Sequence, residues 1–169
     1  WHTLPYTTLF RSGITDDMFL KAIGTFKGAS NRLQMLAKCA NVVVFKDFAH
    51  APSKLRATIQ AVKSQFPEKK LIAFIELHTY SSLNKNFLAE YKGTMDAADV
   101  AYVFYNPAAL KLKRLPEISH EMILEAFNKK NLKVYSDSAE LKTDILKQKQ
   151  NNAVFLFMSS ANFGNIDIK

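Results

Sequence analysis

Two clusters of polar side chains each follow a short apolar run, and their residue types suit binding and acid–base chemistry. The first contains Asp47 and His50, three residues apart and just before Pro52. An acid and a histidine at this spacing, on a turn between a strand and a helix, can hold a ribose hydroxyl and a neighbouring substrate group. From the residues alone, Asp47 is equally well explained as a helix-capping residue, and His50 as a packed turn histidine.

The second cluster covers residues 76–82, with the sequence E-L-H-T-Y-S-S. Polar residues also follow two later apolar runs, at 106–107 and at 159–164. In open α/β sheets, ligands bind beyond the carboxyl ends of the strands, so these positions are candidates for a site. An ordinary capped turn would contain residues of the same types.

Several common catalytic and nucleotide-binding motifs are absent from the sequence. It contains no G-x-x-x-x-G-K-[ST] phosphate loop, no G-x-G-x-x-G fingerprint and no G-x-S-x-G elbow. With Cys39 as the single cysteine, the chain has neither an intramolecular disulfide nor a cysteine-rich zinc site. We therefore expect no metal site within the chain, and no self-contained site for a nucleoside triphosphate.

Short apolar runs alternate with amphipathic stretches from residue 13 onward, a pattern typical of strands and helices around a mostly parallel sheet. The pattern predicts strands over 42–45, 71–75, 100–105, 132–135 and 154–158. It predicts helices over 16–23, after Pro52, and over 84–95, 119–129 and 138–150, with Ser119 and Ser138 as N-caps. The predicted fold is an α/β, Rossmann-like three-layer domain with a mostly parallel sheet of about six strands flanked by helices.

The composition is that of one packed domain with a basic surface. The chain has 169 residues, of which 48% are hydrophobic and 22% charged, and its formal net charge is +8. This charge favours anionic partners such as nucleotides or phosphorylated metabolites, whereas the scattered lysines and the lack of a nucleic-acid-binding motif argue against nucleic acid. With no apolar run near the ~20 residues of a membrane span and no export signal, we expect no membrane partner and a cytoplasmic protein.

The first twelve residues differ in character from the rest. The string H-T-L-P-Y-T-T-L-F-R-S at 2–12 resembles the conceptual translation of a common sequencing adapter. We therefore predict that residues 1–12 are not native and that residues 13–169 form the natural domain. The alternative is a genuine but irregular N-terminal arm.

Four segments resemble, in order, the motifs of the C-terminal domain of the Mur ligases. They are F-K-G-A-S-N-R at 26–32, V-V-V-F-K-D-F-A-H-A-P at 42–52, E-L-H-T-Y-S at 76–81 and M-S-S-A-N-F-G at 158–164. The family patterns are F-x-G-x-x-x-R, D-[YF]-[AG]-H-x-P, P-H-x-Y-[ST] and M-S-[NS]-G-x-F-G. The resemblance covers residues 13–168, and the last motif is more similar to the branch that recycles murein peptides than to the alanine-adding branch.

The resemblance implies an ATP-dependent, cytoplasmic ligase that joins UDP-N-acetylmuramate to a recycled murein peptide. In this family, ATP phosphorylates the substrate carboxylate and the incoming amine attacks the acyl phosphate, giving an amide, ADP and phosphate. The phosphate loop and the Mg2+ ligands belong to the family's central domain. The resemblance therefore implies that the missing N-terminal and central domains are partners of this chain, and that the chain alone is inactive.

Four residues match family positions that have a role in the site. Arg32 matches an arginine that reaches the ATP phosphates, and its planar guanidinium suits that task. Asp47 matches an aspartate that hydrogen-bonds the nucleotide ribose. His50 matches a histidine near the nucleotide and the incoming amine, and His78 one that lies by the amino-acid substrate.

The chain departs from the family pattern at several positions. Thr79 and Ser82 stand where the alanine-adding ligases carry arginines, which favours a larger peptide substrate bound with the help of Tyr80, Ser81, Asn84 and Lys85. Ala161 replaces a glycine of the closing motif, and Lys46 stands where many members have a second Asp. The alternatives are the C-terminal domain of a UDP-N-acetylmuramate–L-alanine ligase and a stand-alone nucleotide-binding module.

Overall fold

The computed structural model describes residues 13–25, 32–148 and 151–166, and within these ranges six strands form one sheet. The strand order is β1-β2-β6-β3-β4-β5. The strands are β1 (Gln34–Lys38), β2 (Val42–Asp47), β3 (Lys70–Leu77), β4 (Val100–Tyr105), β5 (Leu132–Tyr135) and β6 (Ala153–Met158). Only the β1–β2 pair is antiparallel among these strands. The predicted mostly parallel sheet is confirmed.

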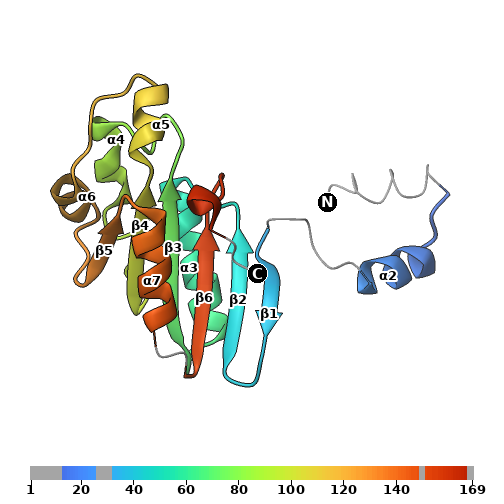
Figure 1. Cartoon of the computed structure of the whole chain (residues 1–169). Helices are drawn as coiled ribbons and strands as arrows, with labels where there is room; N and C mark the ends of the chain where they lie inside the picture. The colour runs from blue at the N-terminus through green and yellow to red at the C-terminus, as the bar shows by residue number, and fades with distance from the viewer. Residues whose placement is uncertain (1–12, 26–31, 149–150, 167–169) are drawn as a thin grey trace.

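Helices cover both faces of the sheet and complete three layers (Figure 1). One face packs against residues of α3 (Pro52–Gln65), α4 (Lys85–Leu88), η1 (Ala89–Tyr91), α5 (Pro107–Leu112) and α6 (His120–Phe127). The other face packs against α7 (Ser138–Lys147) and η2 (Phe163–Asn165). The three-layer α/β fold expected from the sequence is therefore present.

The centre of the sheet is formed by strands that are apolar on both faces. In β3, every residue after Lys70 is buried, and all six residues of β6 are buried. On the α7 face, the ring of Phe74 stacks on Tyr102 at 4.6 Å and on Phe157 at 4.4 Å between ring centroids. Strands buried on both faces are typical of parallel sheets, and this explains the continuous apolar runs in the sequence.

Three elements were not predicted from the sequence, and one of them is the short 3-10 turn η2. β1 has the sequence Q-M-L-A-K and lies mostly exposed at the sheet edge, so it lacks the apolar run that marked the other strands. α5 begins at Pro107 directly after β4, and the Asn106 side chain caps it by accepting a hydrogen bond from the backbone N–H of Ala108. Its six residues are too few to show helical periodicity in a sequence.

The prediction of one helix over 84–95 was wrong, because the helix in the structure is much shorter. Asn84 caps a helix of four residues, and a 3-10 turn follows up to Tyr91. The chain then turns at Gly93, whose φ is 70°. The backbone leaves the helical region one residue earlier, at Lys92, whose ψ is 125°, and the left-handed Gly93 then prevents the helix from resuming.

The predicted cap of the last helix was wrong by one residue. Asp137, not Ser138, is the N-cap of α7, and its carboxylate accepts hydrogen bonds from the backbone N–H groups of Ala139 and Glu140. Ser119 is the N-cap of α6, as predicted. α6 ends at Phe127, and its C-cap Asn128 is left-handed.

The N-terminal helix α2 (Asp16–Gly24) matches the predicted helix over 16–23 and buries none of its residues. Figure 1 shows it away from the sheet. The adapter-like string at 1–12 and residues 26–31 of the first family motif lie outside the described residues. Within the part of the chain that the structure describes, no helix has the length and apolar character needed to cross a bilayer.

The turn after β6 places a strict requirement on Gly164. Its φ is +63°, and a Cβ at this position would lie 3.1 Å from both Phe104 Cζ and Ser138 Cβ. We expect Gly164→Ala to lower the free energy of unfolding of the 169-residue chain by about 1–3 kcal/mol. Urea denaturation measures this loss. Gly24→Ala is the control, since nothing lies within 4 Å of its Cβ, and it should change stability by less than about 1 kcal/mol. Equal stability of the Gly164→Ala variant and the wild type would contradict the strain.

Candidate functional site

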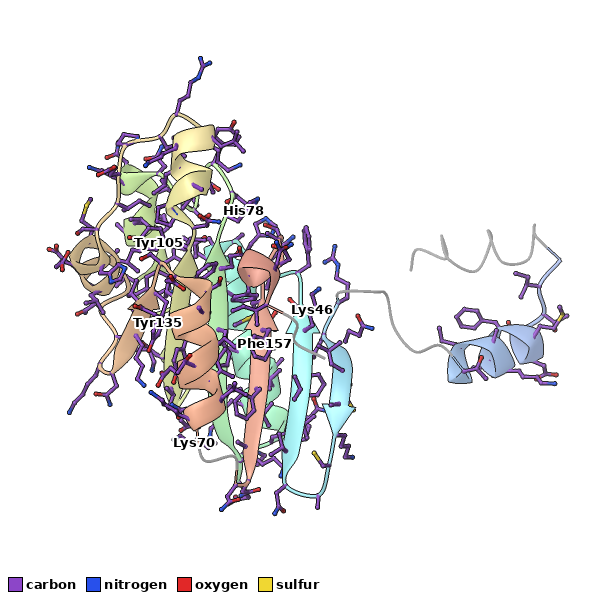
Figure 2. The ribbon with its side chains drawn as sticks, in the orientation of Figure 1. Lys46, Lys70, His78, Tyr105, Tyr135 and Phe157 are labelled. Carbon is purple, nitrogen blue, oxygen red and sulfur yellow. The ribbon has the colours of Figure 1, made fainter. Side chains whose placement is uncertain are left out.

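The carboxyl ends of β2, β6, β3 and β4 meet at one edge of the sheet, because these strands are parallel neighbours. The clusters found in the sequence therefore come together there. In Figure 2, Lys46 and His78 lie toward this edge, whereas Lys70 lies at the opposite end of the sheet. We call this region the carboxyl edge.

Asp47 ends β2 and joins two segments of the chain. Its side chain is only 8% exposed. Its Oδ2 accepts a 2.6 Å hydrogen bond from the backbone N–H of Leu33, and its Oδ1 accepts a 2.7 Å bond from that of Ala49. Asp47 does not cap α3, whose N-cap is Ala51 without a side-chain bond. The carboxylate instead fixes the residues that follow Arg32 and precede His50.

Arg32 lies at the carboxyl edge because of the antiparallel strand β1. Gln34 pairs with Lys46 in the register of β1 and β2, so the start of β1 lies beside the end of β2. The side chain of Arg32 is exposed and forms no ion pair with any residue in the described ranges. A guanidinium without an ion-pair partner among the described residues can take an anionic ligand at this edge.

His50 is anchored within the turn between β2 and α3. Its Nδ1 lies 2.9 Å from the backbone oxygen of Phe48. A carbonyl oxygen only accepts, so Nδ1 carries the proton and Nε2 is the acceptor in the neutral ring. The half-buried ring matches the packed-turn alternative, and within the described residues Nε2 remains available to a ligand.

Tyr91 of η1 forms a hydrogen bond with the same turn. Its hydroxyl donates a 2.6 Å hydrogen bond to the backbone oxygen of His50. Burial raises the pKa of the Tyr91 hydroxyl to about 12, against the lowering effect of a hydrogen bond with Ser82. The hydroxyl therefore remains a donor across the neutral pH range.

A second buried carboxylate, Glu76, holds the loop after β6. It is 3% exposed, and its Oε2 accepts hydrogen bonds from the hydroxyl of Ser159 and, at 2.7 Å, from the backbone N–H of Phe163. The backbone N–H of Ser159 donates in turn to the backbone oxygen of Asp47 at 3.0 Å. Glu76 belongs to a polar cluster of the sequence but had no predicted role, although a charge at the end of a buried apolar run is a signal for one.

The loop after β6 also holds a buried polar atom without a partner. The hydroxyl of Ser160 is the buried side-chain atom of this kind within the described ranges. Such atoms are rare because leaving a buried hydroxyl unbonded has a cost of about 1–3 kcal/mol. Its position next to Ser159 makes it a candidate ligand contact.

The segment after β3 contains the residues predicted to bind the amine substrate. His78 is half-buried and Tyr80 is 64% exposed. The Ser81 hydroxyl lies 3.1 Å from Thr79 Oγ1, which donates a 2.9 Å hydrogen bond to Ser82 Oγ. Hydrogen bonds among these side chains fix the turn and leave the Tyr80 ring exposed to solvent.

Asn84 and Lys85 occupy different positions from His78 and Tyr80. The Asn84 side chain accepts a hydrogen bond from the backbone N–H of Asn86 at 2.9 Å and caps α4. Lys85 lines a groove of about 510 Å³ between α4, η1 and α6, whose lining includes no residue from 78–81. The structure thus brings His78, Tyr80 and Ser81 together and gives Asn84 and Lys85 other surroundings.

One contact at the carboxyl edge was missed by the sequence analysis. The ammonium of Lys113, which follows α5, lies 4.4 Å from the centroid of the Tyr80 ring. The pair is 33 residues apart across two loops, and no local pattern marks it. Among the described residues, no group of three or more His, Cys, Asp or Glu side chains is placed to hold a metal ion.

The role of Asp47 predicts a stability effect. Asp47→Asn replaces one acceptor oxygen with an amide group that faces a backbone N–H donor, so we expect a loss of about 1–3 kcal/mol in the free energy of unfolding. Denaturant titration of the 169-residue chain measures it. Asp137→Asn is the matched control, because one oxygen of Asp137 accepts both of its bonds and Asn caps helices as well as Asp does. Losses of equal size in both variants would refute the two-sided role of Asp47.

Known proteins are similar to this chain over most of the domain. A family model described as "Mur ligase, glutamate ligase domain" matches residues 31–161. The UDP-N-acetylmuramate--L-alanine ligase of Chlorobaculum parvum is 26% identical over 159 residues, which cover 91% of this chain and 34% of that protein. The chain therefore spans about a third of the length of this relative.

Solved structures share the fold. The UDP-N-acetylmuramate-alanine ligase of Thermotoga maritima has a TM-score of 0.70 at 21% identity, covering 94% of this chain and 33% of that one. A murein peptide ligase of Psychrobacter arcticus has a TM-score of 0.64 at 21% identity, covering 86% and 30%. With Arg32 and the three later motifs at one edge of the expected sheet and a family match over 31–161, the chain belongs to the Mur ligase family and contains its C-terminal, glutamate ligase domain.

Proposed function

We propose that this chain is the C-terminal domain of an ATP-dependent ligase that joins UDP-N-acetylmuramate to an amine substrate through an amide bond. The observation that carries the proposal is the pair of hydrogen bonds to Asp47, which hold Leu33 and Ala49 at the carboxyl edge. Arg32 and His50 are the neighbours of these two residues. Arg32 and His50 thus belong to one group at the carboxyl edge, although 18 positions separate them in the sequence.

The nucleotide contacts are assigned to Arg32, Asp47 and His50. Each carboxylate oxygen has a second lone pair, so Asp47 retains accepting capacity for a ribose hydroxyl beside its two backbone bonds. Arg32 is exposed, and the Nε2 of His50 faces no described partner. The residues present therefore fit an adenine nucleotide. ATP supplies the phosphoryl group that activates the carboxylate, and a preceding domain would supply the phosphate loop and most of the Mg2+ ligands.

The amine-substrate contacts are assigned to the segment after β3. His78 and Tyr80 are the best placed, because the hydroxyl of Ser81 bonds Thr79 and the side chain of Asn84 caps α4. Lys85 would contact only a substrate long enough to reach the groove beside α6. Closing this domain over the preceding one would exclude water from the reactive acyl phosphate.

Two amine substrates have support. A recycled murein peptide is favoured by the closing motif at 158–164 and by Thr79 and Ser82, which replace the arginines of the alanine-adding branch. Free L-alanine is favoured by the similarity to UDP-N-acetylmuramate--L-alanine ligases. We propose the peptide and retain L-alanine as the second candidate.

The role of Arg32 is tested in the complete ligase. We expect Arg32→Ala to lower kcat by about 100-fold, because a fixed cation facing the developing phosphate charge is lost. The free energy of unfolding should change by less than about 0.5 kcal/mol, since the side chain is exposed. Phosphate release and denaturant titration give the two values. Lys70→Ala removes a cation at the opposite end of the sheet (Figure 2) and should leave kcat unchanged. Unchanged kinetics of Arg32→Ala would remove the assigned role.

The identity of the amine substrate is tested by assaying the two candidate amines separately. We expect the complete ligase to use L-alanyl-γ-D-glutamyl-meso-diaminopimelate with a kcat/KM at least about tenfold above that for L-alanine. Coupled ADP release with each amine at equal concentration measures the ratio. A ratio below one would select the alanine-adding function, and no ADP release with either amine would refute the ligase proposal.

A further inference from the structure

Tyr80 and Lys113 form a pair at the carboxyl edge that no assigned role explains. Tyr80 follows β3 and Lys113 follows α5, which itself follows β4. Because β3 and β4 are parallel, with Leu77 opposite Tyr105, the two loops begin side by side. The ammonium of Lys113 lies over the exposed Tyr80 ring, 4.4 Å from its centroid. The contact therefore joins the loop of His78 to the loop after β4.

The charge of Lys113 is not neutralised by the protein. The ion pairs among the described residues are Lys63 with Asp99 and Lys133 with Asp144, and neither includes Lys113. A lysine ammonium has three donors, and a ring face engages only one side of it. No acceptor among the described residues takes the remaining donors, so an acceptor from outside the chain can bind them.

The backbone fixes the position from which the Lys113 side chain extends. Lys113 is the C-cap residue of α5, and its N–H donates to the backbone oxygen of Ala109 at 3.1 Å. The next residue, Arg114, has a φ of 54° and turns the chain away from the helix. The side chain thus extends from a defined position toward Tyr80.

The position separates this cation from the nucleotide contacts. Arg32, Asp47 and His50 lie at the end of β2, and β6 lies between β2 and β3. Strands are spaced by about 4.8 Å, so β2 and β3 are roughly 10 Å apart and β4 is farther still. Lys113, held over Tyr80 after β3, therefore lies on the side of β6 that carries the assigned amine contacts.

We propose that Lys113, held over Tyr80, binds a carboxylate of the amine substrate and so helps to select substrates that carry one. This inference rests on the proposed ligase function but not on the choice between its two amines. Both a free amino acid and an acidic peptide carry a carboxylate, and their chemistry toward an ammonium is the same. The pair acts as a specificity determinant beside His78.

The test compares acids with their amides in the complete ligase. Lys113→Gln should raise the KM for the amine substrate about tenfold or more, because a charge-assisted hydrogen bond is lost. The KM for ATP should stay unchanged. For L-alaninamide, or for the tripeptide with every carboxylate amidated, the wild type and the variant should have equal KM values. Comparing L-alanine with the tripeptide shows which amine supplies the carboxylate.

Three further variants define the contact. Lys113→Arg should retain the KM of the wild type, because it keeps the charge. Tyr80→Leu removes the cation–π contact together with the assigned contact of the Tyr80 ring, so it should raise the KM for the acid by at least about two- to fivefold. Lys111→Gln, on the same helix, is the control and should behave as the wild type.

Two outcomes separate this inference from the function on which it rests. Ligation by the wild type together with an equal KM change for acid and amide, or no change, would overturn the role of Lys113 alone. Failure of the wild type to ligate either amine would overturn the proposed function and this inference together. Melting temperatures of all variants within a few degrees of the wild type are expected for exposed positions.

Discussion

The buried carboxylate of Asp47 is the interaction on which the arrangement of the carboxyl edge depends. It accepts backbone hydrogen bonds from the start of β1 and from the turn before α3, at 2.6 and 2.7 Å. A carboxylate that is only 8% exposed needs such donors, because burying a charge without partners is costly. The requirement works in both directions: the charge is stabilised by the two segments, and the two segments are fixed by the charge. Arg32 and His50 acquire defined positions as a result.

Glu76 performs the equivalent task on the opposite face of the sheet. Side chains alternate along a strand, so Glu76 shares the face of Phe74, whereas Asp47 shares the face of Phe45. Both carboxylates are satisfied by hydrogen-bond donors and neither forms an ion pair with a described residue. Ser159 connects them, because its hydroxyl donates to Glu76 and its N–H donates to the backbone of Asp47. The ends of β2 and β3 and the loop after β6 are therefore joined by hydrogen bonds.

The strand order divides this edge into two regions. The end of β2, with β1 beside it, carries the residues assigned to the nucleotide, and the ends of β3 and β4 carry those assigned to the amine. β6 lies between them and contributes the Ser160 hydroxyl, a buried atom without a described partner. The proposed ligase activity requires that two ligands be held close together without overlap. The sheet provides this spacing through the fixed distance between its strands.

The sequence by itself determined the parallel strands, the α/β layers and the candidate residues Asp47, His50 and His78, because continuous apolar runs and the polar residues that end them are local signals. It did not determine β1 or α5, whose five and six residues carry no periodic pattern. The helix predicted over 84–95 was too long, because the backbone leaves the helical region at Lys92 and the left-handed Gly93 follows. Only the tertiary structure decided which polar residues meet. Hydrogen bonds from Leu33 to Asp47 and from Ser159 to Glu76 join residues far apart in the chain, and their geometry depends on strand order rather than on neighbours in sequence.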